Sequence, residues 1–564
     1  MSDQHFHAIV IGSGFGGSVM TYRFAEAGHS VCLLERGKKY PPGSFPRSPA
    51  GMKTNFWDPS RGLHGVYNVW SFKQLAAVVS SGLGGGSLIY ANVFIRKDER
   101  WFVKEDPKKA GYESWPLTRA DLDPHYDRVE KIIQPQRYPV EYSPYDQTPK
   151  LKALRAAGEA LSRDAPPGTV AFMLPKLAVT FANPNQAPVP GEPIQEPFPN
   201  LHGRTRSTCR LCGECDIGCN YGSKNTLDYN YLTLAARAGA ELRTRSEVRS
   251  FGPRQDGVGY EVYYVEHSDG VVDTAALPLK RLTCDRLVLS AGAIGSTFLL
   301  LKNAGRFPGL SERLGHAFNG NGDILGLAVH ARDHKTGKGR LTEPSFGPVI
   351  TGALRFADEL DGQGATGRGF YVEDAGYPEI VNWLAQDANV GGSVVRIARF
   401  VWRWLRMHFG ADPSSDLSAA VSALLGSGGF TKSFMPLLGM GRDVPSGRAY
   451  LRDGCLALDW SIGPLQAYFE KARGSMRDIA RALEAELSDD PLWYLSQELT
   501  VHPLGGCPMG RSRQEGVVDA HGEVFGFPGF YVADGSVMPG PVGPNPSLTI
   551  AACADHFADR ALNA

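Results

Sequence analysis

The sequence predicts an α/β protein with a dinucleotide-binding domain of the Rossmann type, and three observations support this fold class. An apolar, β-branched stretch at 7–11 leads directly into a glycine-rich turn at 12–17, and a helix-forming stretch follows to residue 27. A second apolar stretch, 30–34, ends in an acidic residue. The chain has 564 residues, too many for one ordinary core, so further structural units are expected.

The first turn and the acid that follows it have the composition of a nucleotide site. Gly12 permits the tight turn, Gly14 lets the backbone approach a pyrophosphate, and Gly17 lets the helix pack on the strand. The acid is Glu35, 23 residues after Gly12, and its carboxylate is expected to accept hydrogen bonds from both ribose hydroxyls of an adenosine. Phe15 and Gly16 complete the predicted site. This pattern alone does not separate NAD from FAD.

Later segments favour FAD. A glycine-rich loop at 80–87 has no strand, helix and acid of its own, which indicates backbone wrapped around a second part of the same cofactor. A strand at 286–290 leads into a turn and a helix, and a strand at 529–532 delivers an acid to a turn. The cofactor residues expected outside the first turn are Gly82, Gly84, Gly85, Gly86, Ser87, Val248, Ala291, Gly292, Asp534, Gly535, Asn545, Pro546 and Ser547.

Together these pieces resemble the glucose-methanol-choline (GMC) family of FAD oxidoreductases over nearly the whole chain. The resemblance implies a discontinuous FAD domain from residues 1–105, 205–320 and 500–564. It implies a substrate-binding domain from 106–204 and 321–499, with a mixed or antiparallel sheet and a lid-like segment at 382–444. Non-covalent FAD is expected, because the residues after the second glycine loop, 88–90, include no His or Cys for attachment.

Two segments near the C-terminus have the residues that alcohol oxidation needs. An alcohol gives up hydride only as its hydroxyl proton is removed, and a His is a natural proton acceptor near neutral pH. His502 lies in the run His-Pro-Leu-Gly-Gly, and in the resembled family such a His faces the flavin and pairs with a second His or an Asn. Here that partner is Asn545, as in cholesterol-oxidase-like members, and Ser547 is expected to cap the last helix. The same likeness suggests Glu373 as an accessory acid or base, with a solvated acid at a strand end as the alternative.

Four cysteines, Cys209, Cys212, Cys215 and Cys219, occupy eleven residues with a spacing typical of iron–sulfur ligation in ferredoxins. Asn220 stands where ferredoxins usually have proline, so the match is incomplete. A zinc site is the least favoured interpretation, because structural zinc ligands usually come in two separated pairs. Purely structural thiols remain the other alternative. Sugar dehydrogenases of the resembled family have a cluster in this part of the chain, which favours iron and sulfide here.

Charge and hydropathy limit the partners. Lys plus Arg equals Asp plus Glu at 59 each, so the net charge gives no reason to expect nucleic acid binding. No membrane-spanning run or secretion signal is present, which predicts a cytoplasmic protein. Arg396, Arg399, Arg403 and Arg406 would share one helical face beside apolar residues. Such a helix is either a peripheral contact with the inner membrane or an ordinary surface helix with a solvated face.

These observations favour FAD-dependent oxidation of a bulky apolar alcohol, 3β-hydroxysteroid-like or terpenoid, with electrons passing to oxygen, a quinone or an acceptor protein. A sugar or other alcohol dehydrogenase that reduces a cytochrome is one alternative. A non-redox relative of the GMC family, a lyase or a photodecarboxylase, is another. The presence of both His502 and Asn545 favours alcohol oxidation.

Overall fold

The computed structural model describes residues 4–105, 111–329, 331–332, 340, 342–362, 364–377, 434–489 and 497–563. Within these ranges, no helix is long and apolar enough to cross a membrane. Residues 382–433 of the predicted lid-like segment, which include the four arginines, lie outside the described ranges.

The larger sheet has seven strands and joins the two ends of the chain. Its central strand β1 (Gln4–Ile11) lies between β2 (Val31–Leu34) and β16 (Lys280–Leu289), and both pairs are parallel. Two further parallel strands are β13 (Glu241–Arg243), beside β2, and β25 (Phe530–Val532), beside β16. An antiparallel extension is formed by β14 (Ser246–Pro253) and β15 (Tyr260–Glu266). The predicted order of strand, turn, helix, strand is therefore confirmed at the N-terminus.

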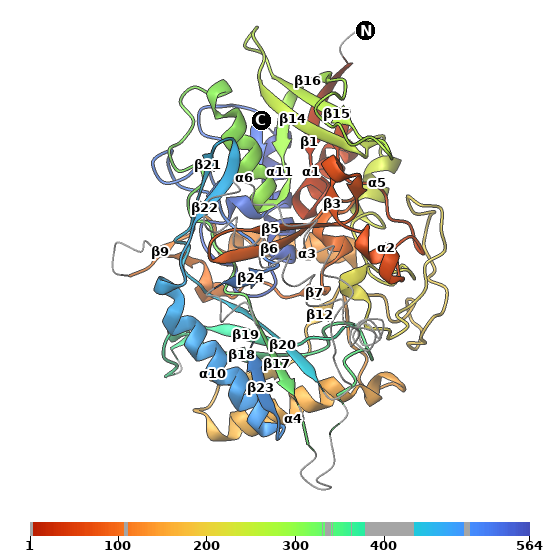
Figure 1. The fold of residues 1–564 in the computed structure, drawn as a ribbon, viewed down its shortest axis with the longest axis vertical. Coiled ribbons are helices and arrows are strands. Elements are labelled where there is room, and N and C mark those ends of the chain that lie inside the picture. The colour runs from red at the N-terminus through yellow and green to blue at the C-terminus, as the bar shows by residue number, and fades with distance from the viewer. Residues whose placement is uncertain are drawn as a thin grey trace.

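Helices cover this sheet in the upper part of Figure 1. The helix after the first turn, α1 (Phe15–Glu26), packs against α5 (Tyr231–Arg237) and the last helix, α11 (Ser547–Asn563). A further helix, α3 (Arg119–Ile133), packs on α11, and α6 (Gly292–Asn303) follows β16. Strands β1, β2 and β16 end in the buried apolar runs 8–11, 31–34 and 287–289, because the central strands of a parallel sheet are covered on both faces.

A second sheet of six strands lies in the lower part of Figure 1 and is antiparallel throughout. Its order is β11 (Val170–Met173), β18 (Ala353–Phe356), β19 (Phe370–Asp374), β20 (Met435–Gly441), β17 (Ile324–Val329) and β23 (Glu486–Asp489). One face packs on α10 (Gln466–Ala482) and α4 (Pro149–Asp164), through a core that includes Phe370 and Val372. Because side chains alternate along a strand, Tyr371 and Glu373 point to the opposite face.

A small three-stranded sheet lies between the two large ones in Figure 1. It consists of β5 (Tyr67–Ser71), β6 (Leu75–Ser80) and β24 (Glu498–Thr500). The second glycine-rich loop leaves from the end of β6, and His502 follows β24 by two residues. This sheet therefore brings a predicted cofactor loop and the predicted base to the same region of the molecule.

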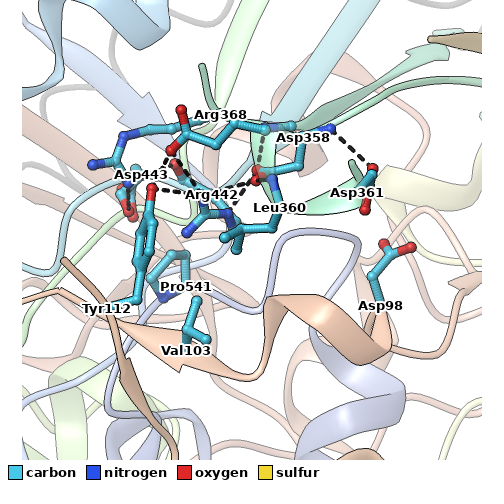
Figure 2. Close-up of polar contacts among 12 residues, drawn as sticks. Asp98, Val103, Tyr112, Asp358, Leu360, Asp361, Arg368, Arg442, Asp443 and Pro541 are labelled. Carbon is cyan, nitrogen blue, oxygen red and sulfur yellow. Dashed lines mark hydrogen bonds and ion pairs between the residues drawn. The ribbon is translucent and has the colours of Figure 1, made fainter. Parts of the chain in front are cut away.

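Ion pairs around Arg442 and Arg368 join Glu105 to the end of β20 in the six-stranded sheet. Figure 2 shows Arg442 beside Asp358 and Arg368. The Arg442 guanidinium donates two hydrogen bonds to the Asp358 carboxylate, at 2.7 and 3.0 Å, and both side chains are buried. Arg442 and Arg368 both contact Glu105. Removing one partner of a buried pair leaves an uncompensated charge, so these contacts resist displacement. They fix the end of β20 and also Asp443, the residue that follows Arg442.

Candidate functional site

The two glycine-rich loops lie directly against each other. Gly12 has a φ of +96°, and a Cβ atom there would lie 2.3 Å from the Ser290 carbonyl oxygen, so only glycine fits the turn. Gly85 has a φ of +54°, and its Cβ would lie 2.6 Å from the Gly14 Cα. A Cβ on Gly14 would meet no protein atom within 4 Å, so this side of the backbone is open. The two loops thus leave an open strip of backbone of the kind that a pyrophosphate approaches.

Glu35 is buried at the end of β2, beside the first turn. Its Oε2 accepts hydrogen bonds from the Ser13 backbone N–H at 3.1 Å and the Ser13 hydroxyl at 2.6 Å. Its Oε1 accepts one from the Gly37 N–H at 2.8 Å. A carboxylate has about four acceptor positions, so the predicted ribose contact is compatible with these bonds. Glu35 therefore also braces the turn that faces the pyrophosphate.

The third predicted cofactor segment, around Asp534, is also tied together. Asp534 Oδ2 accepts from the Gly292 N–H at 2.9 Å and from the Ser296 hydroxyl, and Oδ1 accepts from the Ser536 N–H at 2.8 Å. Burial raises the pKa of this carboxyl. These bonds join Asp534 and Gly535 to Ala291 and Gly292 at the start of α6. Val248 lies apart from them, buried in β14 beside a β-bulge.

Several buried polar atoms near these segments have no hydrogen-bond partner among the described residues. They are the hydroxyls of Ser81 and Ser547, the Oδ1 of Asn545, and both amide atoms of Asn92. Buried polar atoms normally find a partner, so this group fits a large polar ligand such as FAD. Sequence reasoning missed Asn92, although an Asn shortly after a glycine-rich loop was a usable signal. Ser547 is the first residue of α11 and its hydroxyl forms no capping bond, so that expectation was wrong.

His502 lies at the edge of this region with its ring held on one side. Its Nδ1 is 2.8 Å from Asp323 Oδ1, and its side chain is 15 % exposed. Asp323 is fully buried and its Oδ2 accepts the backbone N–H groups of Val501 and His502, at 2.8 and 3.1 Å. A carboxylate with these donors is an acceptor, so the ring proton belongs on Nδ1. Nε2 then retains a lone pair that can accept a proton.

Asn545 and Glu373 lie together in the structure. Asn545 Nδ2 donates to Glu373 Oε2 at 3.4 Å, and both residues are buried. Burial raises the pKa of Glu373 to about 8, and the neighbouring Asp374 and Asp323 carboxylates contribute to this shift. Glu373 is therefore mainly neutral at pH 7, in contrast to the solvated acid that was its alternative. Asp374 is anchored by the buried Lys150, whose Nζ lies 3.3 Å from its Oδ2, and this fixes the end of β19.

The chain is similar to known oxidoreductases. The family model described as GMC oxidoreductase matches residues 468–554, which contain His502 and Asn545. A cholesterol oxidase from Mycobacterium tuberculosis (strain CDC 1551 / Oshkosh) is 28 % identical, over 98 % of this chain and 90 % of its own length. A cholesterol oxidase from Acinetobacter baumannii is 26 % identical, over 99 % of this chain and 94 % of its own.

Over nearly its whole length the chain is similar to GMC-type oxidoreductases. Its fold is similar to that of pyridoxine 4-oxidase from Mesorbium loti, with a TM-score of 0.55, 16 % identity and 98 % of each chain covered. The predicted fold class is thus confirmed, and FAD is the cofactor that the open glycine loops and the unpartnered polar atoms would hold. The chain is an FAD-dependent alcohol oxidoreductase by the same comparisons. The domain limits and the roles of individual site residues stay predictions.

The four clustered cysteines lie in a loop next to the second glycine-rich loop. Lys224 joins the two: its buried Nζ donates to the backbone oxygens of Leu88, Tyr90 and Cys215, at 3.3, 2.9 and 2.8 Å. All nine cysteines are free. Among the described residues, no group of three or more His, Cys, Asp or Glu side chains is arranged so that it could hold a metal ion. That finding supports neither the zinc nor the iron–sulfur interpretation.

Proposed function

We propose that this GMC oxidoreductase oxidises a bulky, apolar secondary alcohol of the 3β-hydroxysteroid or terpenoid type to its ketone. The observation that supports this best is the surface around Glu373. Glu373 pairs across the strands with Leu438 on β20, and Leu438 pairs in turn with Leu325 on β17. Both leucines are partly exposed. A carboxyl whose cross-strand neighbours are partly exposed leucines fits an alcohol whose hydroxyl is its one polar group.

The proposed roles follow from the geometry of the three polar groups. Nε2 of His502 accepts the proton of the substrate hydroxyl, and the Asn545 amide orients the oxygen from which this proton leaves. Glu373 is the accessory acid, because it is neutral at pH 7 and its Oε1 has no partner among the described residues. Bound non-covalently, FAD supplies a two-electron acceptor for the hydride that leaves the carbinol carbon. Loss of one proton and one hydride converts the alcohol to the ketone.

A substrate panel tests the proposal. We expect purified holoenzyme to convert 3β-hydroxysteroids and bulky terpenoid alcohols with a kcat/KM far above that for sugars or short alcohols, with ketone as product. Leu438→Asn and Leu325→Asn should raise KM for the bulky alcohols and leave a short soluble alcohol nearly unaffected. Leu327→Asn is the matched control, because Leu327 lies further along β17 and opposite Pro436. A preference for sugars would favour the alternative dehydrogenase, and turnover without ketone would favour a non-redox relative.

We further propose that electrons leave through an iron–sulfur cluster bound by Cys209, Cys212, Cys215 and Cys219. Three of these sulfurs accept a hydrogen bond from a backbone N–H group. Cys209 accepts from Leu211, Cys212 from Glu214, and Cys215 from Val349. Hydrogen bonds to ligand sulfurs are typical of iron–sulfur sites. The acceptor would be a protein or a quinone.

Iron and acid-labile sulfide analysis of anaerobically prepared enzyme tests this second proposal. We expect about four of each per chain, and a broad visible absorption that is lost in Cys215→Ser. Cys455→Ser is the control, because Cys455 lies in β22 (Cys455–Asp459), outside the cysteine loop. Full activity without iron would contradict the cluster and leave the structural-thiol interpretation.

A further inference from the structure

One short loop contacts both segments that contain the proposed catalytic residues. The loop reads Asn319-Gly320-Asn321-Gly322-Asp323 and leads directly into β17 of the six-stranded sheet. All five residues are buried. The side chains of Asn321 and Asp323 are separated by a single glycine. Asn321 bonds to the segment near residue 544, whereas Asp323 bonds to the segment near residue 502.

The Asp323 side chain holds the His502 segment. Besides the bond to the imidazole Nδ1, its carboxylate accepts the N–H groups of Val501 and His502. Thr500 also donates to it, at 2.9 Å. One buried carboxylate thus fixes both the backbone and the ring of His502.

The Asn321 side chain holds the Asn545 segment. Its Oδ1 accepts the Gly543 N–H at 2.9 Å, and its Nδ2 lies 3.2 and 3.3 Å from the carbonyl oxygens of Gly543 and Pro544. Lys97 holds the two residues before them, with its buried Nζ 2.8 Å from the Pro541 oxygen and 2.9 Å from the Val542 oxygen. Four consecutive residues before Asn545 are therefore fixed by side chains from elsewhere.

The six-stranded sheet also holds the loop itself in place. Asp443 Oδ2 accepts the Gly320 N–H at 3.2 Å, and Asn321 accepts the Gly441 N–H through its backbone oxygen at 2.9 Å. Both contacts come from the end of β20, next to the Arg442 ion pairs. Glu373 lies on the adjacent strand β19. The loop is thus built into the same sheet that carries Glu373.

We propose that residues 319–323 form a positioning platform that sets His502, Asn545 and Glu373 relative to one another, with Asp323 and Asn321 as positioning residues. This inference rests on the proposed function. Asp323 keeps the ring proton on Nδ1 and so keeps the lone pair of Nε2 toward the substrate. Asn321 fixes the distance of the Asn545 amide from that lone pair. Small displacements of reacting groups cost on the order of 100-fold in rate, so both contacts matter for the chemical step.

A double-mutant cycle tests the platform. Asp323→Asn places an amide donor against Nδ1 and so favours the tautomer with the proton on Nε2. We expect anaerobic reduction of the bound flavin to slow on the order of 100-fold, with an unchanged Kd for the alcohol. In the His502→Ala background the same change should have no further effect, because Asp323 acts through His502. Additive losses in the two backgrounds would overturn the inference. Asp489→Asn, in β23 and paired with Arg473, is the matched control.

A second readout does not depend on turnover. The Nδ1–H proton between His502 and Asp323 should give a downfield proton NMR signal in the holoenzyme that disappears in Asp323→Asn and in His502→Ala. A signal unchanged in Asp323→Asn would overturn the role of Asp323. If His502→Ala reduces flavin at the wild-type rate, the proposed function fails, while this signal still decides whether Asp323 holds the ring.

For Asn321 the test variant is Asn321→Gly, because the residue has a φ of +58°, which glycine adopts without strain. We expect a slower flavin reduction with unchanged FAD content, and no further slowing in the Asn545→Ala background. Equal slowing in both backgrounds would show that the loop acts on stability alone and would overturn the role of Asn321.

Discussion

Glu373→Gln separates two chemical roles for this carboxyl. Burial raises the pKa of Glu373 to about 8, so the group is about 90 % neutral at pH 7 and about 10 % neutral at pH 9. If the neutral acid is the active form, Gln resembles it at pH 7 and cannot ionise. We therefore expect the variant to reduce its flavin within a few-fold of the wild-type rate at pH 7.

The wild type should then lose activity relative to Glu373→Gln as pH rises. From the neutral fractions, the ratio of the two rates should fall by roughly tenfold between pH 7 and pH 9. Stopped-flow reduction of bound flavin under anaerobic conditions measures both rates, and taking the ratio cancels every other group that titrates. Asp374→Asn is unsuitable as a control because Lys150 depends on that charge. Glu359→Gln, at an exposed site, is suitable. A 1,000-fold loss in Glu373→Gln at pH 7 would show that the ionised carboxylate acts as a base and would refute this reasoning.

Two further predictions concern cofactor retention and stability. Glu35→Ala should weaken FAD binding by roughly 2 to 4 kcal/mol, because it removes charge-assisted hydrogen bonds in a buried site. The control Glu26→Ala, at an exposed site, should leave FAD binding unchanged. Equal FAD Kd values for the two variants, from titration of the apoprotein, would contradict this. Burial raises the pKa of Asp443 to about 8, above its value in the unfolded chain. Between these two pKa values the folded protein keeps a proton on Asp443 that the unfolded chain has lost. The folded state therefore loses stability as pH rises toward 8. Asp443→Asn should therefore reduce the decline in unfolding free energy between pH 5 and pH 8 by up to about 1.4 kcal/mol per pH unit; identical slopes in denaturant titrations would contradict this.

The parts of this molecule that the sequence could predict are those with local signals. The first turn is recognisable because Gly12, Gly14 and Glu35 lie within one strand–helix–strand unit, where spacing fixes geometry. His502 and Asn545 are predicted as site residues from short motifs, and in the structure the Asn545 amide donates to Glu373. Neither finding required knowledge of long-range packing.

The supporting contacts could not be predicted, because they join segments far apart in the chain. Asp323 bonds to a histidine 179 residues away, and Asn321 bonds to a glycine 222 residues away. The raised pKa of Glu373 depends on its complete burial, which no local pattern records. The alternation of Asn, Gly and Asp at 319–323 was a visible signal of a tight polar loop, but it did not indicate what the loop holds.

The central claim is that His502 removes the hydroxyl proton of an alcohol while its hydride leaves for the flavin. Its most direct test is anaerobic stopped-flow mixing of wild type and His502→Ala with a 3β-hydroxysteroid, monitored by the loss of flavin absorbance. We predict rapid bleaching in the wild type and a rate lower by a factor on the order of 100 to 10,000 in the variant, with similar alcohol binding. Flavin reduction at the wild-type rate in His502→Ala would contradict the mechanism.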